Sequence, residues 1–517
     1  MRSLRRNTLS DSTTSEKNSL IMMICTLLSR TLGIVKSAVI SSIFGGGAVT
    51  DAINFAYNIP NSLRKLFAEG SLNASYLPIF AEKRDEKEES SYLYSLIINF
   101  QIVIFIPLIL ITIFYGRTII TFLSNFNSDY QINIASSLLP YFTLFLFFIS
   151  LSSLFATILQ TRRCFLSSSA APIFFSLAVI LSLSIFSKYV GEYAMAIGTV
   201  SGSIAQCLVC FIALKRFHLK YYFTFDFSYP LFKRMLRSWL PATITSLVAV
   251  ISQQITYYFA SSLEAGSITA FSNAIIFYQT PYGIFFTAIA GVFFPELSRV
   301  KDDKKRGEIL LKSLTYLYTL LLPSALILTA LGKECIAIVL QHGAFTLENT
   351  LLTYSVLIYY LPSMISSAFY AMLQRNCYAR GEYNRALVVS IITSFVDVLL
   401  TYIFIKAGLL VKSISIAYLI SSTLGFIILL IYEKNFSLIS FIKEILKLTL
   451  INLPTLILTI LYLVYGFTYY KEGASFHSIT LTLLFGFAFV LIVFILYVVF
   501  HVSFLEGLKR KKIAPKN

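Results

Sequence analysis

Five charged residues fall within two otherwise apolar segments near the start of the chain: Arg30, Lys36, Arg64, Lys65 and Glu69. An ionised side chain at membrane depth costs about 2.5 to 3.5 kcal/mol on insertion scales, so it persists where it is paired, hydrated or in contact with a ligand. A cluster of such residues is harder to dismiss than one charge. We therefore treat this cluster as the candidate functional site.

The spacing divides the cluster into a neutral pair and a positive excess. Lys65 and Glu69 are four residues apart and share a helix face, so they can neutralise each other. Asn61 and Arg64 share another face, and Arg64 remains in excess together with the two cations of the first segment. Because the planar fork of arginine pairs bidentately with phosphate, we expect a cationic cavity for an anionic ligand. The alternative is snorkelling, or an internal salt bridge that fastens the two segments.

Two carboxylates stand apart from this cluster. Asp51 follows the glycine run 45–47, which lacks the Lys-Ser/Thr of a phosphate-binding loop and predicts a tight turn. Asp51 is then either a helix N-cap or a charge that tunes the cavity. Asp397 is alone in an apolar segment, as a coupling-ion or proton site or as a hydrogen-bonded structural residue. Gln253 and Gln254 are candidate polar partners for it, or else join helices.

The apolar runs that position these residues are long enough to cross a membrane. The chain has 517 residues, 57% hydrophobic and 13% charged, and a mean hydropathy of +0.76. A helical span needs about 20 apolar residues, whereas barrel strands alternate in polarity over about 10. The sequence therefore predicts an all-α polytopic membrane protein with 14 transmembrane helices. The predicted spans lie near 19–43, 51–82, 91–115, 133–159, 168–187, 192–214, 238–261, 267–298, 308–331, 350–374, 383–405, 412–432, 445–466 and 476–504.

The net charge of +17 reflects membrane topology. If the N-terminus is cytoplasmic, 32 of the 42 Lys and Arg residues fall in the cytoplasmic segments or at the helix ends beside them, and 6 fall on the opposite side. This bias matches the positive-inside rule and predicts that both termini are cytoplasmic. We therefore do not expect a nucleic-acid partner.

The longest cytoplasmic connection interleaves bases with aromatic residues, which is typical of an interfacial helix or linker in the headgroup layer. A weak repeat supports a division there, because Tyr57 to Pro60 and Tyr278 to Pro281 occupy corresponding spans of two halves. We therefore expect two six-helix lobes plus two C-terminal helices. The parts are an N-terminal tail (1–18), the first lobe (19–214), the linker (215–237), the second lobe (238–432), the last two spans (433–504) and a basic tail (505–517).

Catalytic and cofactor motifs are missing from the sequence. It contains no metal cluster, catalytic triad, Walker loop or dinucleotide fingerprint, and its four histidines are scattered. Cys207 and Cys210 form a C-x-x-C inside an apolar span, where we interpret them as small buried hydrophobic residues. We expect neither an enzyme nor a resident cofactor or metal.

The segment "LLSRTLGIVKSAVISSIFGGGAVTDAINFAYNIPNSLRKLFAEGSLNASYLPIFAE" (27–82) resembles the MurJ (MviN) family of lipid II flippases, within the group of multidrug and oligosaccharidyl-lipid exporters. Ser29-Arg30, Asp51, Pro60-Asn61, Arg64 and the stretch ending at Glu69 stand in the family's pattern. Further agreement comes from "PYGIFFTAIAGVFFPELSR", "LQHGAFT" and "YARGEYNRA", so the resemblance covers nearly the whole chain.

The resemblance implies a substrate and a place of action. The substrate is lipid II, an undecaprenyl-pyrophosphate-linked muropeptide, exported from the inner to the outer leaflet of the bacterial cytoplasmic membrane. The family's cavity arginines correspond to Arg30 and Arg64, and its aspartate after the first turn corresponds to Asp51. The family's last two spans form a groove for the lipid tail. We expect a monomer in contact with membrane lipids, alone or with the cell-wall synthesis machinery.

Two positions depart from the family pattern. Where the family usually has Arg-Asp late in the first span, this chain has Lys36-Ser37. Where the eighth span usually carries Asp-Arg, this chain has Ile275-Ile276, so one cationic ligand of the cavity is missing. Nearby Asn273 and Gln279 offer neutral hydrogen bonds only. Asp397 lies in a span where some members bind sodium, but the full ligand set does not match.

Our hypothesis is a lipid-linked oligosaccharide flippase that works by alternating access through a cationic central cavity. The predicted substrate-binding residues are Ser29, Arg30, Lys36, Asn61 and Arg64; Asp51, Lys65 and Glu69 gate or tune the charge. Energy coupling is open between sodium, protons and the membrane potential. The alternatives are a polysaccharide-unit flippase or a cation-coupled drug antiporter of the same fold, and a membrane scaffold that transports nothing.

Overall fold

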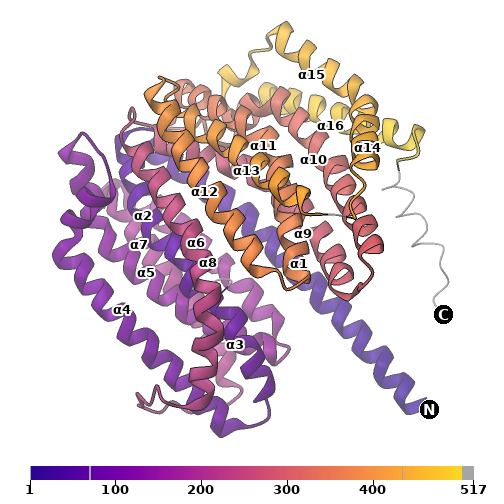
Figure 1. Ribbon diagram of the computed structural model, residues 1–517. Helices are drawn as coiled ribbons and strands as arrows, with labels where there is room; N and C mark the ends of the chain where they lie inside the picture. The colour runs from indigo at the N-terminus through magenta and orange to yellow at the C-terminus, as the bar shows by residue number, and fades with distance from the viewer. Residues whose placement is uncertain (1, 69–70, 434, 503–517) are drawn as a thin grey trace. The chain divides into compact units, whose positions relative to one another are not determined.

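The computed structural model describes residues 2–68, 71–433 and 435–502, and the regular elements in these ranges are all helical (Figure 1). In chain order they are α1 (Arg2–Phe44), α2 (Ala48–Phe67), α3 (Ser71–Glu82), α4 (Lys87–Leu123), α5 (Asp129–Thr161), α6 (Phe165–Val190), α7 (Tyr193–Lys215), α8 (Pro230–Ser261), α9 (Ser267–Arg299), α10 (Asp303–Leu340), α11 (Leu347–Ala379), α12 (Tyr383–Lys406), α13 (Lys412–Ile431), α14 (Leu438–Ile451), α15 (Leu453–Tyr465), the 3₁₀ helix η1 (Tyr469–Glu472) and α16 (Phe476–Val499).

Eleven of the described helices are long and apolar enough to cross a membrane, and α14 with α15 makes a twelfth if this bent pair is one span. The prediction of an all-α polytopic membrane protein is therefore confirmed. The other two predicted spans correspond to α2 with α3 and to α8, which are more polar. The count of 14 spans stays a prediction.

The second predicted span, 51–82, is wrong as a single helix, because α2 ends at Phe67 and α3 begins at Ser71. Side chains from neighbouring helices bind the carbonyl oxygens that the end of α2 leaves open. The Trp239 indole N–H donates to the carbonyl of Leu66 over 3.1 Å, and the Ser150 hydroxyl donates to that of Phe67 over 2.9 Å. A helix end inside the protein is tolerated because its polar groups are satisfied in this way.

The predicted span 445–466 is also divided. Helix α14 ends at Ile451, α15 begins at Leu453, and their axes differ by 50°. Pro454 lies in the first turn of α15, where a proline is tolerated because its missing N–H would have no helical partner. The Asn452 amide donates to the carbonyl of Leu448 over 2.8 Å, which holds the bend.

The connection between α7 and α8 differs from an interfacial helix, because residues 218–226 have no helical structure. Three polar side chains of α4, at spacings of four residues, bind its backbone. The Ser91 hydroxyl accepts from the N–H of Lys220 over 3.1 Å, and Ser95 accepts from the N–H of Tyr222 over 2.9 Å. The Asn99 amide donates to the carbonyl of Thr224 over 2.7 Å. One face of α4 therefore replaces the hydrogen bonds that a helix would have formed.

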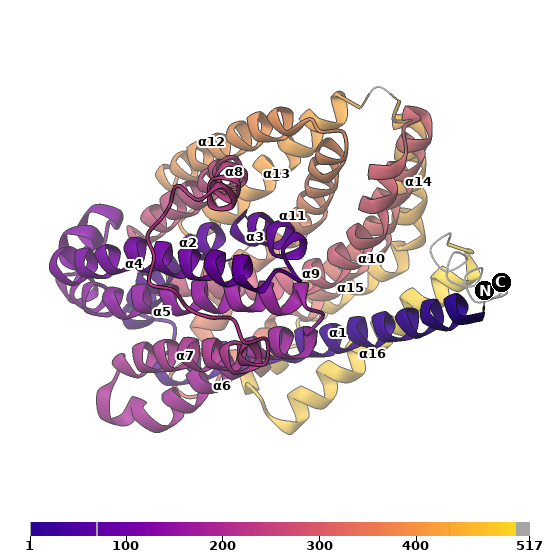
Figure 2. The ribbon, with the colours of Figure 1, turned by 90° about the horizontal axis from the view of Figure 1, so that it is seen from below.

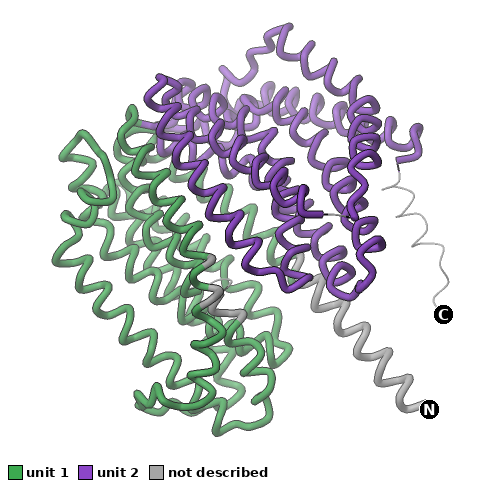
Figure 3. The backbone as a smooth tube through the Cα atoms, viewed as in Figure 1, with its two compact units in different colours: residues 1–265 green, residues 266–517 purple. Residues whose placement is uncertain are grey.

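Residues 1–265 and 266–517 form two compact units (Figure 3). In unit 1, α5 contacts α2, α3, α4, α6 and α7, while α8 contacts α2, α3 and α4. In unit 2, α11 contacts α9, α10, α12 and α13, and α10 also contacts α14, α15, α16 and η1. Helix α8, which the sequence division assigns to the second lobe, belongs to unit 1 because its side chains bond to α2. The remaining lobe boundaries stay predictions.

Close packing in unit 1 depends on small residues at the contact of α6 with α7, which lie side by side (Figure 2). Gly198 and Gly202 are one turn apart on α7. A Cβ at Gly202 would lie 2.8 Å from the backbone oxygen of Phe175, and a Cβ at Gly198 would lie 3.0 Å from the Cα of Val179. Without those Cβ atoms the two helices approach closely, as membrane helices with small-xxx-small motifs do.

Candidate functional site

The glycine run forms the turn that orients α2. Gly45 has a φ of +72°, which favours glycine, and Gly47 is the N-cap of α2. The Thr50 hydroxyl donates to the carbonyl of Gly45 over 2.9 Å. Asp51 lies in the first turn and is 2% exposed. The N-cap alternative for Asp51 is therefore wrong, and this carboxylate is a buried group close to the positive end of the helix dipole.

Lys36 of α1 lies beside aromatic rings of two neighbouring helices. Its ammonium is 5.8 Å from the ring centre of Tyr57 on α2 and 5.4 Å from that of Phe175 on α6. Cations bind such ring faces, and the interaction strengthens as water is removed. The guanidinium of Arg64 is near enough for its positive charge to act on this ammonium. The structure thus brings together two of the three predicted cations, Lys36 and Arg64, which repel each other.

The other predicted ligands lie along the same two helices. Arg30 is exposed and Ser29 is half-buried on α1. Six residues separate Arg30 from Lys36, which is about 9 Å along the helix axis. Asn61 is half-buried on α2, one turn before Lys65. The polar groups are therefore arranged as a row on α1 and a row on α2 rather than as one compact cage.

A hydrogen-bonded row of amides joins α2 to α8. The Lys65 ammonium donates to Oε1 of Gln253 over 2.8 Å, and the Gln253 amide donates to Oδ1 of Asn58 over 2.8 Å. The Asn58 amide donates to Oε1 of Gln254 over 3.5 Å. Gln253 and Gln254 thus join helices, which is one of the two roles expected for them. Glu69, the predicted partner of Lys65, lies outside the described residues.

The donor and acceptor roles in this row of hydrogen bonds follow from the chemistry of lysine. A lysine ammonium only donates hydrogen bonds, so the carbonyl of Gln253 must face Lys65 and its NH₂ must face away, toward Asn58. The sequence contained part of this signal, because Asn58 and Lys65 are seven residues apart and share a helix face. The sequence also identified Gln253 and Gln254 as residues that could join helices, but it did not identify α2 as their partner.

Asp397 is half-buried on α12 in unit 2 and accepts a hydrogen bond from the Ser421 hydroxyl of α13 over 3.2 Å. This contact favours the hydrogen-bonded structural interpretation and leaves the coupling-ion role a prediction. On α9, Asn273 is 6% exposed, and nearby Tyr278 shares hydrogen bonds with Ser367 and Tyr418 over 3.0 and 3.2 Å. The Tyr278 hydroxyl, on the residue two positions after Ile276, therefore lies among serine and tyrosine hydroxyls.

An ion pair that sequence reasoning missed lies at the ends of α11 and α13. The Glu433 carboxylate accepts hydrogen bonds from two side chains. Arg380 Nη2 lies 2.7 Å from Oε2, and the Asn376 amide donates to Oε1 over 2.8 Å. Burial raises the pKa of Glu433, and the Arg380 guanidinium opposes that rise. Arg380 falls in the quoted stretch "YARGEYNRA", which was the available signal. Its partner was not identifiable from spacing.

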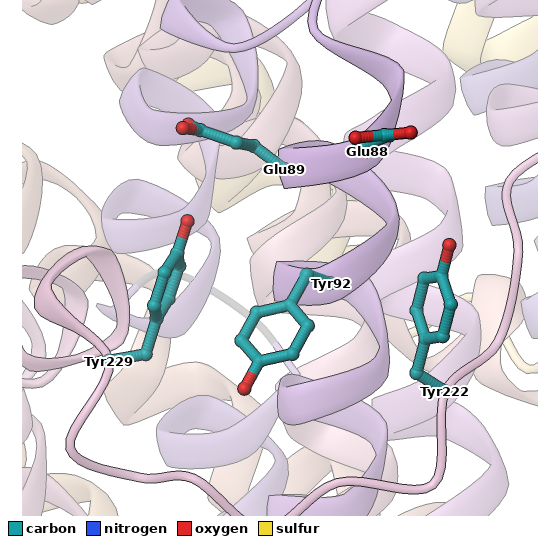
Figure 4. A pocket seen from close by; sticks show the side chains of 5 residues that line it. All are labelled: Glu88, Glu89, Tyr92, Tyr222 and Tyr229. Atoms are coloured by element: carbon teal, nitrogen blue, oxygen red, sulfur yellow. The ribbon is translucent and has the colours of Figure 1, made fainter.

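A cavity of about 500 Å³ lies where α4 begins, beside the segment between α7 and α8 (Figure 4). It is lined by Glu88, Glu89, Tyr92, Tyr222 and Tyr229. Its carboxylates give it the wrong charge for an anionic ligand, so it is distinct from the predicted site.

Lys83 lies close to this cavity and pairs with one of its carboxylates. The Lys83 ammonium is 2.8 Å from Glu89 and 3.1 Å from Glu86. Hydrogen bonds to Glu89 and then Glu86 raise the pKa of Lys83. Across the described residues, no group of three or more His, Cys, Asp or Glu side chains is placed to hold a metal ion.

Comparisons with known proteins point to one family. The family model described as "Lipid II flippase MurJ" matches residues 40–486. The "Probable lipid II flippase MurJ" of Borreliella burgdorferi is 28% identical over 498 residues, which cover 94% of this chain and 97% of that protein.

Solved structures show the same likeness. "Lipid II flippase MurJ, inward closed conformation" aligns with a TM-score of 0.78 and 25% identity, over 95% of this chain and 99% of that one. An inward-facing multidrug resistance MATE transporter of the MOP superfamily aligns with a TM-score of 0.66 at 13% identity, over 83% of this chain and 98% of that one, which shows a shared fold.

Proposed function

The chain belongs to the MurJ family of lipid II flippases, and from this premise we propose that it moves lipid II from the inner to the outer leaflet of a bacterial cytoplasmic membrane by alternating access. The observation that carries the proposal is the family match, which extends through both compact units. The transported molecule is an anionic headgroup on a long apolar tail, and translocation makes or breaks no covalent bond.

The cationic groups of α1 and α2 suit the pyrophosphate of this substrate. Lys36 and Arg64 are held close despite their mutual repulsion, and a bound dianionic group would relieve that repulsion. Arg30, Ser29 and Asn61 extend the polar surface toward the sugar and peptide. Because arginine offers a bidentate fork, we assign the tighter phosphate contact to Arg64.

Other groups on α2 set the charge of this site. Lys65 is engaged by Gln253, so it holds α2 on α8 rather than acting only as a ligand. We assign the balancing negative charge to Asp51 of α2 and to Glu69, which lies outside the described residues. The membrane potential also acts on the empty cationic site. Each positive charge that crosses 100 mV changes the free energy by about 2.3 kcal/mol. Sodium, bound at Asp397, and protons are the other candidate energy sources.

The deciding experiment replaces the flippase of a depletion strain with this chain or its variants. Wild type should restore growth, and Arg30→Ala and Arg64→Ala should fail to restore it at equal membrane levels. Arg117→Ala is the matched control, because this exposed arginine pairs with Asp129 over 2.9 Å at the end of α4. Exposed pairs contribute about 0 to 1 kcal/mol, so this variant should behave as wild type.

A translocation assay with labelled lipid II in vesicles then separates the alternatives. Transport that is lost with Arg64→Ala and retained with Arg117→Ala supports the proposal. Repeating the assay without sodium, or with the potential collapsed, identifies the energy source. Lack of rescue by a well-expressed wild type, or rescue unaffected by loss of both Arg30 and Arg64, would favour a scaffold or another substrate.

A further inference from the structure

Glu334 is a buried carboxylate in the apolar helix α10 that no role described above uses. Its residue is 1% exposed. One carboxyl oxygen, Oε1, accepts a hydrogen bond from the hydroxyl of Tyr462 on α15 over 3.0 Å. The other oxygen, Oε2, is buried and has no hydrogen-bond partner in the described part of the chain. This carboxyl therefore lies at the contact between α10 and α15 with half of its polar surface unsatisfied.

The charged and titratable groups around Glu334 do not neutralise it. The positive charge of Lys333 favours the ionised carboxylate, but its ammonium lies 5.2 Å from the ring centres of both Tyr354 and Tyr470, and no ion pair joins it to Glu334 in the described part of the chain. The Tyr354 hydroxyl donates to the carbonyl of Thr329 over 2.7 Å. The groups from each neighbouring element are Lys333 and Cys335 of α10, Tyr354 of α11, Tyr462 of α15, Tyr469, Tyr470 and Glu472 of η1, and His477 of α16.

The apolar cover of the site is aromatic. The ring of Tyr462 is 4.9 Å from that of Phe467 and 5.3 Å from that of Phe485. Tyr462 also belongs to a buried cluster with Ala330 and Leu331 on α10. With 1% of Glu334 exposed, its carboxyl is shielded from water while α15 packs on α10.

Energies decide between the two forms of the carboxyl. Removing an ion from water costs several kcal/mol even after the protein relaxes, and one hydrogen bond to a charged group returns about 1.5 to 3 kcal/mol. A neutral carboxyl with one unsatisfied group costs about 1 to 3 kcal/mol. We propose that Glu334 is a proton-binding site whose proton stabilises the contact between α10 and α15.

The binding step is simple. The carboxylate takes one proton from water, forms an O–H bond and becomes neutral, and release returns the proton to water. The neutral carboxyl is stable in the closed contact, whereas the ionised carboxylate requires water. Proton binding therefore stabilises the closed contact by the same free energy by which the closed contact stabilises the bound proton. The packing of α15 on α10 is thereby linked to pH through one side chain, whatever lipid the protein transports.

Infrared difference spectroscopy of the protein in lipid nanodiscs tests the bound proton. Wild type at neutral pH should show a carbonyl band of a protonated carboxylic acid that shifts in D₂O, and Glu334→Gln should lack it. Tyr462→Phe should keep the band at higher frequency, because the carbonyl loses its donor. Glu472→Gln is the control at an exposed carboxyl of the same region, and it should leave the band unchanged. Identical spectra for wild type and Glu334→Gln would overturn the proposal.

Two further outcomes are decisive. Hydrogen–deuterium exchange of α15, corrected for intrinsic rates, should speed up at high pH in wild type and stay constant in Glu334→Gln; equal pH dependence in both would refute the linkage. A carbonyl band that appears only after sodium is removed would identify a cation site instead of a proton site.

Discussion

Replacement of Arg380 by alanine should destabilise unit 2 more than any exposed charge deletion in the same region. The Glu433 side chain is 3% exposed and receives one donor from Arg380 and one from Asn376. Removing the guanidinium leaves a buried carboxylate with a single neutral donor. Breaking a buried pair from one side costs about 3 to 5 kcal/mol, because the remaining charge is uncompensated.

The matched control is Arg385→Ala. Arg385 also bonds to a glutamate, Glu382, but both side chains are about a third exposed. Such a pair contributes about 0.2 to 1 kcal/mol. The two variants therefore remove the same chemical group from nearby positions and differ chiefly in the burial of the hydrogen-bonded partner. Arg385 also lies 4.9 Å from the ring centre of Tyr432 and acts on Glu433 without bonding to it, so its loss tests the long-range charge alone. Denaturant unfolding in lipid–detergent micelles, followed by helix content, measures both.

The pH dependence gives a second test of the same reasoning. Because burial raises the pKa of Glu433, the folded protein holds this proton more tightly than the unfolded chain, so stability falls as pH rises from the ordinary glutamate value through the raised one. Arg380→Ala removes the charge that opposes this rise, so its loss of stability should deepen toward neutral pH. Adding Glu433→Gln removes the uncompensated charge and should recover most of the loss.

Two results would refute this account. If Arg380→Ala costs no more than Arg385→Ala, the buried pair is not the source of the stability. If Arg380→Ala with Glu433→Gln is no more stable than Arg380→Ala alone, an uncompensated carboxylate is not the cause of the damage.

Two further predictions concern helix contacts in unit 1 and α9. Gly202→Val should lower the free energy of unfolding by about 1 to 3 kcal/mol and reduce the thermal stability, because its Cβ would lie 2.8 Å from a backbone oxygen of α6. Gly291→Ala is the control and should be neutral or slightly stabilising, because no atom lies within 4 Å of the added Cβ. Equal effects of the two variants would refute the packing argument. Gln253→Leu should destabilise by about 1 to 3 kcal/mol, because it leaves the buried Asn58 amide oxygen without this donor and the exposed Lys65 without this acceptor. Gln253→Glu keeps an acceptor for Lys65 and should retain more thermal stability.

The sequence predicted the helical membrane class, the family and the positions of most spans. It also identified α2 as a polar helix whose glycine turn precedes Asp51. The expected pairing of Lys65 with Glu69 stays a prediction, because α2 ends at Phe67 and Glu69 lies outside the described residues. Spacing along a helix is informative only while the helix continues.

Partners on other helices were beyond sequence reasoning. Lys65 bonds to Gln253, 188 residues away, and Trp239 bonds to the carbonyl of Leu66, 173 residues away. The burial of Glu334 against Tyr462 has the same character, with 128 residues between them. Each contact depends on how two helices are rotated and spaced when they pack.

By itself the sequence determined that this chain is a multi-pass helical membrane protein of a lipid-flippase family, because apolar length, charge asymmetry and local motifs are properties of consecutive residues. Only the tertiary structure decided that α2 breaks before α3, that α8 joins unit 1, and that Lys65 faces Gln253. The physical reason is that a helix end or an isolated charge inside a protein is stable only when side chains from other helices satisfy it, and no spacing in one segment specifies where those side chains come from.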